Sequence, residues 1–235
     1  ATDKGKAKIQ DSEGKPSLKV IEYRKKHVLK CVLRAVSHAI GNMPIIGNNR
    51  NTEREDTSRL ASCLKIIFDY GDHIGGANFG LAASTVTDML HRDPTMYDLI
   101  EEAGVTDSFL KSMRRGILPS SEAISTIPGT LVALCLNSKG LEAVKTSKSL
   151  DSFVEVFTST TYHKALQSDT PSVVGAGLDE VMRHVPSLRE YGISVAIKIL
   201  NKIYEEGSKV DEEKPAGAEQ GEAQPMDMEA PILNA

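Results

Sequence analysis

The fold is indicated by a stretch of sequence that occurs twice. Residues 93–110 read DPTMYDLIEEAGVTDSFL, and residues 137–154, forty-four positions later, read NSKGLEAVKTSKSLDSFV. The two segments align without a gap. Each begins with Asp or Asn and ends on Asp-Ser-Phe followed by an apolar residue. A repeat of about 40–47 residues is typical of stacked armadillo or HEAT helical units. The repeat therefore predicts an array of packed helices.

The aligned apolar residues indicate which side chains each unit buries. We expect Phe109 and Phe153 to occupy equivalent buried positions in successive units. The other aligned pairs are Tyr97 and Leu141, Ile100 and Val144, and Met113 and Phe157. Arrays of this kind bind partners along extended surfaces, since each unit contacts mainly its neighbours.

Periodicity elsewhere extends the helical prediction to the whole chain. Apolar residues recur at helical spacing, and no segment alternates with period two for long enough to predict a strand. Aromatic residues make up only 5% of the chain and tryptophan is absent, so an aliphatic core between small helices is favoured. The predicted fold is an all-α, armadillo/HEAT-like helical solenoid at residues 17–206. Its expected helices span 18–40, 52–71, 81–90, 107–115, 122–136, 139–145, 150–157, 173–185 and 188–206, with a short one from Asp93-Pro94.

Several local signals define where these helices begin. Thr52 with Glu55 is typical of a capping box. Asp93 before Pro94, and Thr106 before Asp107, are expected caps. Residues 75–80 are predicted to form a turn because three of them are glycine, and Pro128 is expected to bend or restart its helix.

The two ends of the chain differ from the middle. Residues 1–16 are polar and lysine-rich, without the hydrophobic segment of a signal peptide. Residues 207–235 contain seven acidic residues and two lysines, so this part holds more than the whole net charge of −4. Neither end has enough apolar surface to offset the entropy of ordering. We predict a disordered N-terminal segment at 1–16 and a disordered acidic linker at 207–235, which suggests a fragment of a longer protein.

The sequence offers no set of residues for catalysis, a metal or a cofactor. Cys31, Cys63 and Cys135 are far apart and are expected to be buried, reduced thiols. The six histidines lack metal-ligand spacing, and the glycines lack the pattern of a phosphate-binding loop. No run of eighteen apolar residues occurs, so a membrane span is not expected.

Charged residues in three places are candidates for partner binding. Arg24, Lys25 and Lys26 belong to a basic cluster that could form a solvated helix face, a weak nuclear-import signal or a contact for an acidic partner. Nucleic acid is not expected as a partner, because the interleaved aromatic residues that stack on bases are missing. The other candidates are Arg114 and Arg115, and Arg183 and His184, which follow Asp179 and Glu180 at the spacing of helical ion pairs.

A resemblance to a known family covers roughly residues 79–204. Residues 131–141, LVALCLNSKGL, and residues 177–188, GLDEVMRHVPSL, resemble segments from the N-terminal region of giant HECT-type ubiquitin ligases. The residues HRDP at 91–94 and EAG at 102–104 look most like the plant-type members. In that family this region is an armadillo-like solenoid that contributes to a large scaffold and helps to receive substrates.

The resemblance implies a role in protein ubiquitination without chemistry in this segment. The family's catalytic HECT domain lies at the far C-terminal end, so no cysteine here should inherit its role. The expected partners are protein substrates and other parts of the same ligase, with a ubiquitin-conjugating enzyme engaged only through the absent HECT domain. The expected location is cytoplasmic, and the basic cluster would also permit a nuclear one. The alternatives are a stand-alone armadillo-like adaptor and, less favoured, an enzyme acting by itself.

Overall fold

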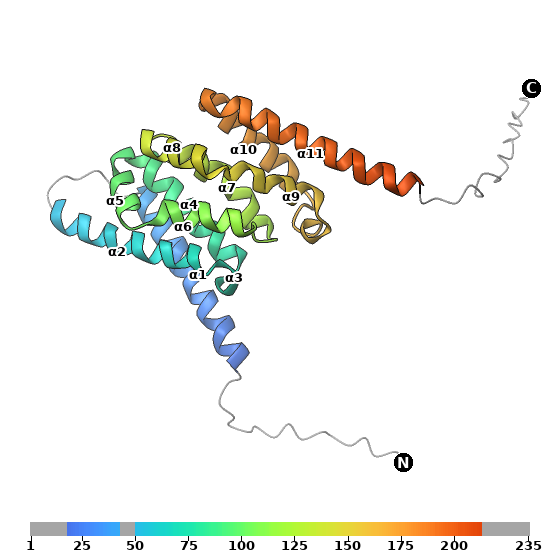
Figure 1. Cartoon of the computed structure of the whole chain (residues 1–235). Helices are drawn as coiled ribbons and strands as arrows, with labels where there is room; N and C mark the ends of the chain where they lie inside the picture. The colour runs from blue at the N-terminus through green and yellow to red at the C-terminus, as the bar shows by residue number, and fades with distance from the viewer. Residues whose placement is uncertain (1–17, 43–49, 213–235) are drawn as a thin grey trace, which may run out of the picture.

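The computed structural model describes residues 18–42 and 50–212, and within these ranges every regular element is a helix (Figure 1). The all-α prediction is therefore confirmed. The elements are α1 (Leu18–Asn42), α2 (Arg50–Asp69), α3 (Gly71–Ile74), α4 (Gly76–Arg92), η1 (Pro94–Met96), α5 (Tyr97–Glu102), α6 (Val105–Arg115), α7 (Ser121–Leu134), α8 (Ser138–Ser147), η2 (Ser149–Asp151), α9 (Ser152–Thr158), η3 (Thr160–Tyr162), α10 (Thr170–His184) and α11 (Pro186–Glu212).

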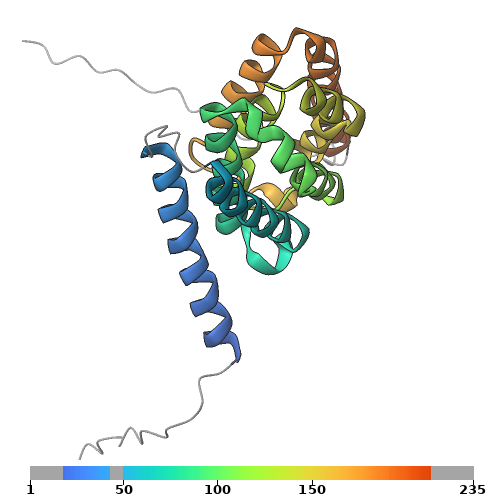
Figure 2. The same ribbon diagram turned by 90° about the vertical axis from the view of Figure 1, so that its left-hand side faces the viewer.

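The longer helices are stacked in the manner of a solenoid. Helix α4 packs between α1 and α7, and α7 packs between α4 and α10. On the other side of this row, α2 contacts α6, and α9 contacts α11. Figure 2 shows α1 along one side of the stack, with α10 and α11 at the opposite side. Helices mostly contact their neighbours along the stack, as expected for a repeat architecture.

The repeat corresponds to two successive three-helix units, α4–α6 and α7–α9. The backbone N–H of Thr95 donates to Oδ1 of Asp93, and that of Lys139 donates to Oδ1 of Asn137, each over 2.9 Å. The first residue of each repeat therefore forms the same cap. Phe109 and Phe153 are only 1% and 0% exposed, which confirms their predicted equivalence. Leu141 and Phe157 are half-buried, unlike their buried counterparts Tyr97 and Met113.

The serine of each Asp-Ser-Phe motif ties its unit to the preceding one. The Ser152 hydroxyl donates to the carbonyl oxygen of Met113 over 2.9 Å, thirty-nine positions earlier. Lys65 and Ser108, which has the equivalent position in the first unit, together lower the pKa of Asp69 at the end of α2. The Met113 carbonyl, in the last turn of α6, also accepts from the backbone N–H of Gly116 over 3.1 Å, so Ser152 adds a second hydrogen bond to it.

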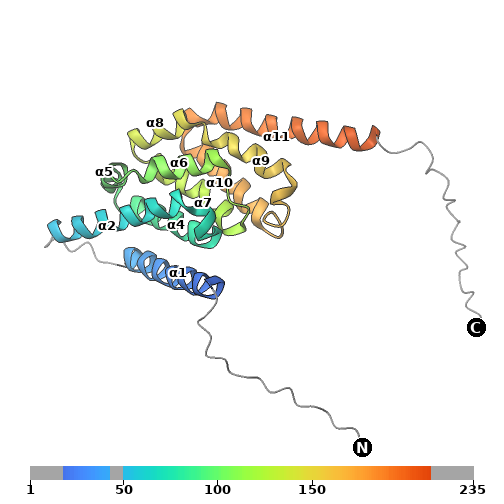
Figure 3. The same ribbon diagram turned by 60° about the horizontal axis from the view of Figure 1, so that its bottom comes forward.

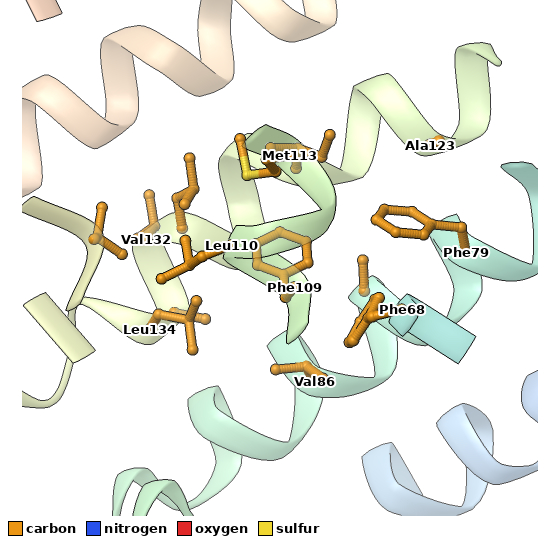
Figure 4. Close-up of a cluster of buried hydrophobic side chains, with 14 of the residues drawn as sticks. Phe68, Phe79, Val86, Phe109, Leu110, Met113, Ala123, Val132 and Leu134 are labelled. Carbon is orange, nitrogen blue, oxygen red and sulfur yellow. The ribbon is translucent and has the colours of Figure 1, made fainter. Parts of the chain in front are cut away.

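The core runs through the stack and contains a cluster of aromatic rings. Phe68, Phe79 and Phe109, from α2, α4 and α6, meet with ring centroids 5.1–6.2 Å apart (Figure 4). Small residues let the helices approach closely. A Cβ on Gly177 would lie 2.6 Å from Cβ of Pro128, so a larger residue there would not fit between α10 and α7 without a shift. Helix α7 continues through Pro128 from Ser121 to Leu134.

Three helices begin at residues other than those predicted. Helix α2 begins at Arg50, so Thr52 lies inside it. Helix α4 begins at Gly76, and the predicted turn at 75–80 is reduced to Gly75, whose φ of 93° glycine adopts without strain. Helix α6 follows Gly104, with φ of 77°, so Thr106 lies within its first turn. Glycines with positive φ, rather than polar caps, set two of these boundaries.

Two further expectations differ from the structure. Helix α11 continues to Glu212, so the first six residues of the predicted linker at 207–235 are helical. The remaining linker residues, 213–235, and the predicted N-terminal segment lie outside the described residues. The prediction of buried cysteines is wrong: Cys31 and Cys63 are exposed, and Cys135 is half-buried. The apolar stretch around each cysteine indicates a helix, but it does not specify whether the cysteine lies on the side of that helix that faces the core.

Candidate partner-binding groove

A groove of about 350 Å³ lies where the first repeated unit meets the second. Helices α5 and α6 form one wall and α8 forms the other. We call it the inter-unit groove. The residues that line it are Tyr97, Glu101, Thr106, Asp107, Leu110, Arg114, Ala143, Thr146 and Ser147.

The inter-unit groove combines an apolar base with a charged rim. Tyr97 and Leu110 are buried, while Asp107 and Arg114 are exposed. Burial raises the pKa of the Tyr97 phenol, so it is a neutral hydroxyl at physiological pH. Thr106, Thr146 and Ser147 also belong to the lining, although the Thr106 hydroxyl is buried and the Ser147 hydroxyl donates to the carbonyl oxygen of Val144. Such a surface suits one or two side chains of an extended polypeptide, held by a few polar contacts.

A charged contact crosses the boundary between the two units beside the groove. Lys139, at the start of α8, lies 3.2 Å from Oδ1 of Asp98 and 3.3 Å from Oε2 of Glu101 on α5. Hydrogen bonds to these carboxylates, first to Asp98, raise the pKa of Lys139. Because all three side chains are well exposed, the contact orients the walls rather than contributing much stability.

The neighbouring arginine has a different position. Arg115 donates through Nη2 to the carbonyl oxygens of Phe68 and Asp69, each over 3.3 Å. It thereby satisfies carbonyl groups at the end of α2. Consecutive helical residues point about 100° apart, so Arg114 faces the groove while Arg115 faces α2. Arg115 has a structural contact, and a partner-binding role for it stays a prediction.

The other predicted residues lie on other helices. On α10, Arg183 pairs with Asp179, and His184 lies 4.0 Å from Oε1 of Glu180, so the expected i,i+4 contacts are present. On α1, Arg24 and Lys25 are exposed, and Lys26 lies 3.5 Å from Oε1 of Glu22. Arg114 alone among the predicted residues lines the inter-unit groove. Tyr97, Thr106 and Thr146 were missed, although the repeat boundary itself indicated where two units would meet.

Residues 2–230 match the family described as Domain of Unknown Function (DUF913). This chain belongs to the DUF913 family. The DUF913 match covers nearly the whole sequence, including both copies of the repeat and every residue of the inter-unit groove.

The DUF913 chain is also similar to parts of known ubiquitin ligases. It is 40% identical to the E3 ubiquitin-protein ligase UPL2 of Arabidopsis thaliana over 94% of its length, and 42% identical to UPL1 over 86%. The mouse E3 ubiquitin-protein ligase HUWE1 is 29% identical over 61% of the chain. The matched parts are only 6%, 5% and 4% of these relatives. The resemblance to giant ubiquitin ligases is therefore confirmed.

The described part of this DUF913 chain contains no cluster of three or more His, Cys, Asp or Glu side chains that could hold a metal ion. Burial raises the pKa of the Cys135 thiol to about 11, which keeps it protonated and a poor nucleophile at neutral pH. Among the described helices, none is long and apolar enough to span a membrane.

Proposed function

We propose that this DUF913 chain is an armadillo-like scaffold segment of a giant HECT-type ubiquitin ligase, and that the inter-unit groove binds protein substrates or partners. The observation that supports the proposal most is the position of the groove. It lies at the boundary of two repeated units, in a chain whose relatives are named as ubiquitin ligases. Grooves between stacked units supply side-chain-lined surface for extended polypeptides.

The proposed partners follow from the same assignment. Protein substrates would lie along the groove, and other regions of the ligase would pack against the remaining faces. A ubiquitin-conjugating enzyme would be engaged through a HECT domain outside this sequence. Arg114 would contact an acidic or carbonyl group of the bound polypeptide, because its guanidinium is exposed at the rim.

The test compares Arg114→Glu with Arg183→Glu in the full-length parent protein, since both arginines are exposed but only Arg114 lines the groove. Ubiquitinated proteins are quantified in cells carrying each variant. Transfer of ubiquitin from a conjugating enzyme to the ligase is measured in parallel. We expect Arg114→Glu to lower modification of a subset of substrates several-fold while ubiquitin transfer to the ligase is unchanged. Equal substrate profiles for both variants would contradict the role of the groove.

A stand-alone armadillo-like adaptor is the second candidate, because the matched relatives extend far beyond this chain and their other regions need not accompany it. The full-length gene product decides between the two: a C-terminal HECT domain supports the ligase and its absence supports the adaptor. An enzyme acting by itself would discharge ubiquitin from a charged conjugating enzyme using this chain alone. A thioester on any of its cysteines would overturn the scaffold proposal.

We also propose a cytoplasmic location, with nuclear entry promoted by Arg24, Lys25 and Lys26. The supporting observation is the exposure of Arg24 and Lys25 on α1. A fluorescent fusion of the full chain tests it. Loss of nuclear signal in a Lys25→Ala, Lys26→Ala variant is the expected result, and an unchanged distribution would contradict it.

A further inference from the structure

A second groove, similar in volume but almost wholly apolar, lies between α9, α10 and α11. Its volume is about 360 Å³. We call it the α9–α11 groove. The residues that line it are Leu150, Phe153, Phe157, Gly175, Leu178, Val181, Met182, Gly192, Val195, Ala196, Ile199 and Leu200. The proposed function does not use this groove.

Apolar side chains continue from the groove along the exposed face of α11. Ile193, Ile197, Leu200 and Tyr204 are spaced by four, three and four residues, so they lie on one side of the helix. Leu200 is 66% exposed and Tyr204 is 76% exposed. Figure 3 shows that the C-terminal part of α11 extends past the helices packed against its beginning. A stripe of this kind is the usual mark of a contact surface.

The wall that α11 contributes to the groove is firmly attached. Asp151 accepts hydrogen bonds from the Tyr191 hydroxyl over 2.9 Å and from Nζ of Lys198 over 2.7 Å. These contacts fix two turns of α11 against η2. The groove is therefore preformed, which lowers the entropic cost of binding a segment in it.

The sequence that follows α11 contains a matching apolar segment. After a polar stretch at residues 213–225, the sequence 226–233 reads MDMEAPIL, with Met226, Met228, Ile232 and Leu233 as its large apolar residues. Methionine side chains adapt to irregular apolar surfaces because they are unbranched and flexible. The segment can therefore adapt its side chains to an apolar groove of irregular shape.

The spacing between this segment and the groove also fits. From Leu200 to its end at Glu212, α11 leads away from the groove over about 18 Å, at 1.5 Å per residue. The following residues must span this distance to reach the groove again. The thirteen residues 213–225 can extend to roughly 43–47 Å. In general, thirteen residues of flexible polypeptide have a root-mean-square end-to-end distance of about 20 Å. A linker whose average length equals the distance to be spanned gives the highest effective concentration.

We propose that residues 226–233 pack into the α9–α11 groove of the same chain. The contact covers the apolar lining of the groove, which includes Leu200 and ends before Tyr204. This inference does not depend on the proposed function.

The test uses the full chain with methyl-labelled methionine, because Met182 lines the groove while Met226 and Met228 belong to the segment. We expect nuclear Overhauser effects between the segment methyl groups and Met182, and equally slow tumbling for all three. Leu200→Glu, at an exposed position, should release Met226 and Met228 to the narrow lines of a free chain. The paired change Ile232→Asp, Leu233→Asp should do the same. Tyr204→Glu, one turn further along α11 and outside the groove, is the matched control.

Every other outcome overturns the proposal. Narrow Met226 and Met228 lines that ignore Leu200→Glu would show that the groove does not hold the segment. Contacts that disappear on tenfold dilution, together with a doubled mass, would assign the groove to a second copy of the chain. Release by Tyr204→Glu as strongly as by Leu200→Glu would indicate a general effect of charge on α11.

Discussion

Asp107 and Asp151 occupy the same position of the repeat but have different surroundings. Asp107 is exposed at the rim of the inter-unit groove. Asp151 accepts hydrogen bonds from Tyr191 and Lys198 on α11. Burial alone would raise the pKa of Asp151, but the hydrogen bonds from Lys198 and Tyr191 outweigh it and lower the pKa. One aspartate of the pair therefore contributes to stability, and the other is available to a partner.

This difference predicts a pH-dependent effect of Asp151→Ala. At pH 7 the variant should lose about 1 kcal/mol of unfolding free energy, a modest value because the side chain is partly exposed. A lowered folded-state pKa gives stability that is present above the unfolded pKa, near 4, and is lost as pH falls through the folded value. The deficit should therefore shrink in acid. Urea denaturation between pH 2 and 7 measures it, and Asp107→Ala should change stability by no more than about 0.5 kcal/mol.

A second residue-scale prediction concerns two glycines. A Cβ on Gly140 would lie 2.2 Å from the carbonyl oxygen of Leu134 and 2.7 Å from Cε2 of Tyr97, whereas a Cβ on Gly129 would meet nothing within 4 Å. Gly140→Ala should destabilise the chain by about 1–3 kcal/mol, because backbone must move. Gly129→Ala should stabilise it by up to about 1 kcal/mol through helix propensity. Thermal denaturation compares them, and equal melting temperatures would contradict the close contact.

At the scale of elements, the two three-helix units show how a repeat can keep its core while its surroundings change. The caps at Asp93 and Asn137 and the buried Phe109 and Phe153 are equivalent. Phe157, however, is half-buried at the α9–α11 groove, while its counterpart Met113 is buried. The first unit is followed by α7 and the second by α10. The side chains of Met113 and Phe157 are therefore covered to different extents.

Truncation of the equivalent phenylalanines tests this description. Phe109→Ala and Phe153→Ala should each cost about 3–5 kcal/mol, because each removes a fully buried ring and leaves a cavity. Phe157→Ala should cost clearly less, since part of its ring is exposed. Chemical denaturation followed by circular dichroism measures all three. A Phe157→Ala loss as large as the other two would show that the repeat register is wrong at this position.

At the scale of the whole molecule, the row of helices has a well-covered middle and open sides. Helices α4 and α7 have neighbours on both sides, whereas α1 and α11 each have an exposed apolar face that includes Val28 and Val32, or Ile193 and Ile197. In a stack held by nearest-neighbour contacts, the end helices open at the lowest free energy.

Hydrogen exchange should reveal this gradient. Amides of α4 and α7 should exchange most slowly, and those in the second half of α11 should exchange fastest among the described helices. Mass spectrometry of the full chain at several labelling times measures the rates. If residues 226–233 pack into the α9–α11 groove, Leu200→Glu should accelerate amide exchange around Leu200, while exchange in α4 should be unchanged. Uniform protection from α1 to α11 would contradict a stacked array.

Some features were predictable because they depend on neighbours along the chain. The spacing of apolar residues is local, and so are the caps at Asp93 and Asn137 and the ion pairs of α10. The predicted first residues of α4 and α6 were wrong, and this also has a physical reason. Gly75 and Gly104 adopt positive φ there, and the sequence around them does not show which of several glycines takes that conformation.

The sequence by itself determined the helical class, the forty-four-residue repeat, the buried phenylalanines and the relation to giant ubiquitin ligases. Only the tertiary structure decided which charged residue reaches a groove, which aspartate is bound to α11 and which cysteine faces solvent. Periodicity specifies that a helix has an apolar side. Which side chains remain uncovered depends on helices that lie some forty residues away in the sequence and meet only when the units stack.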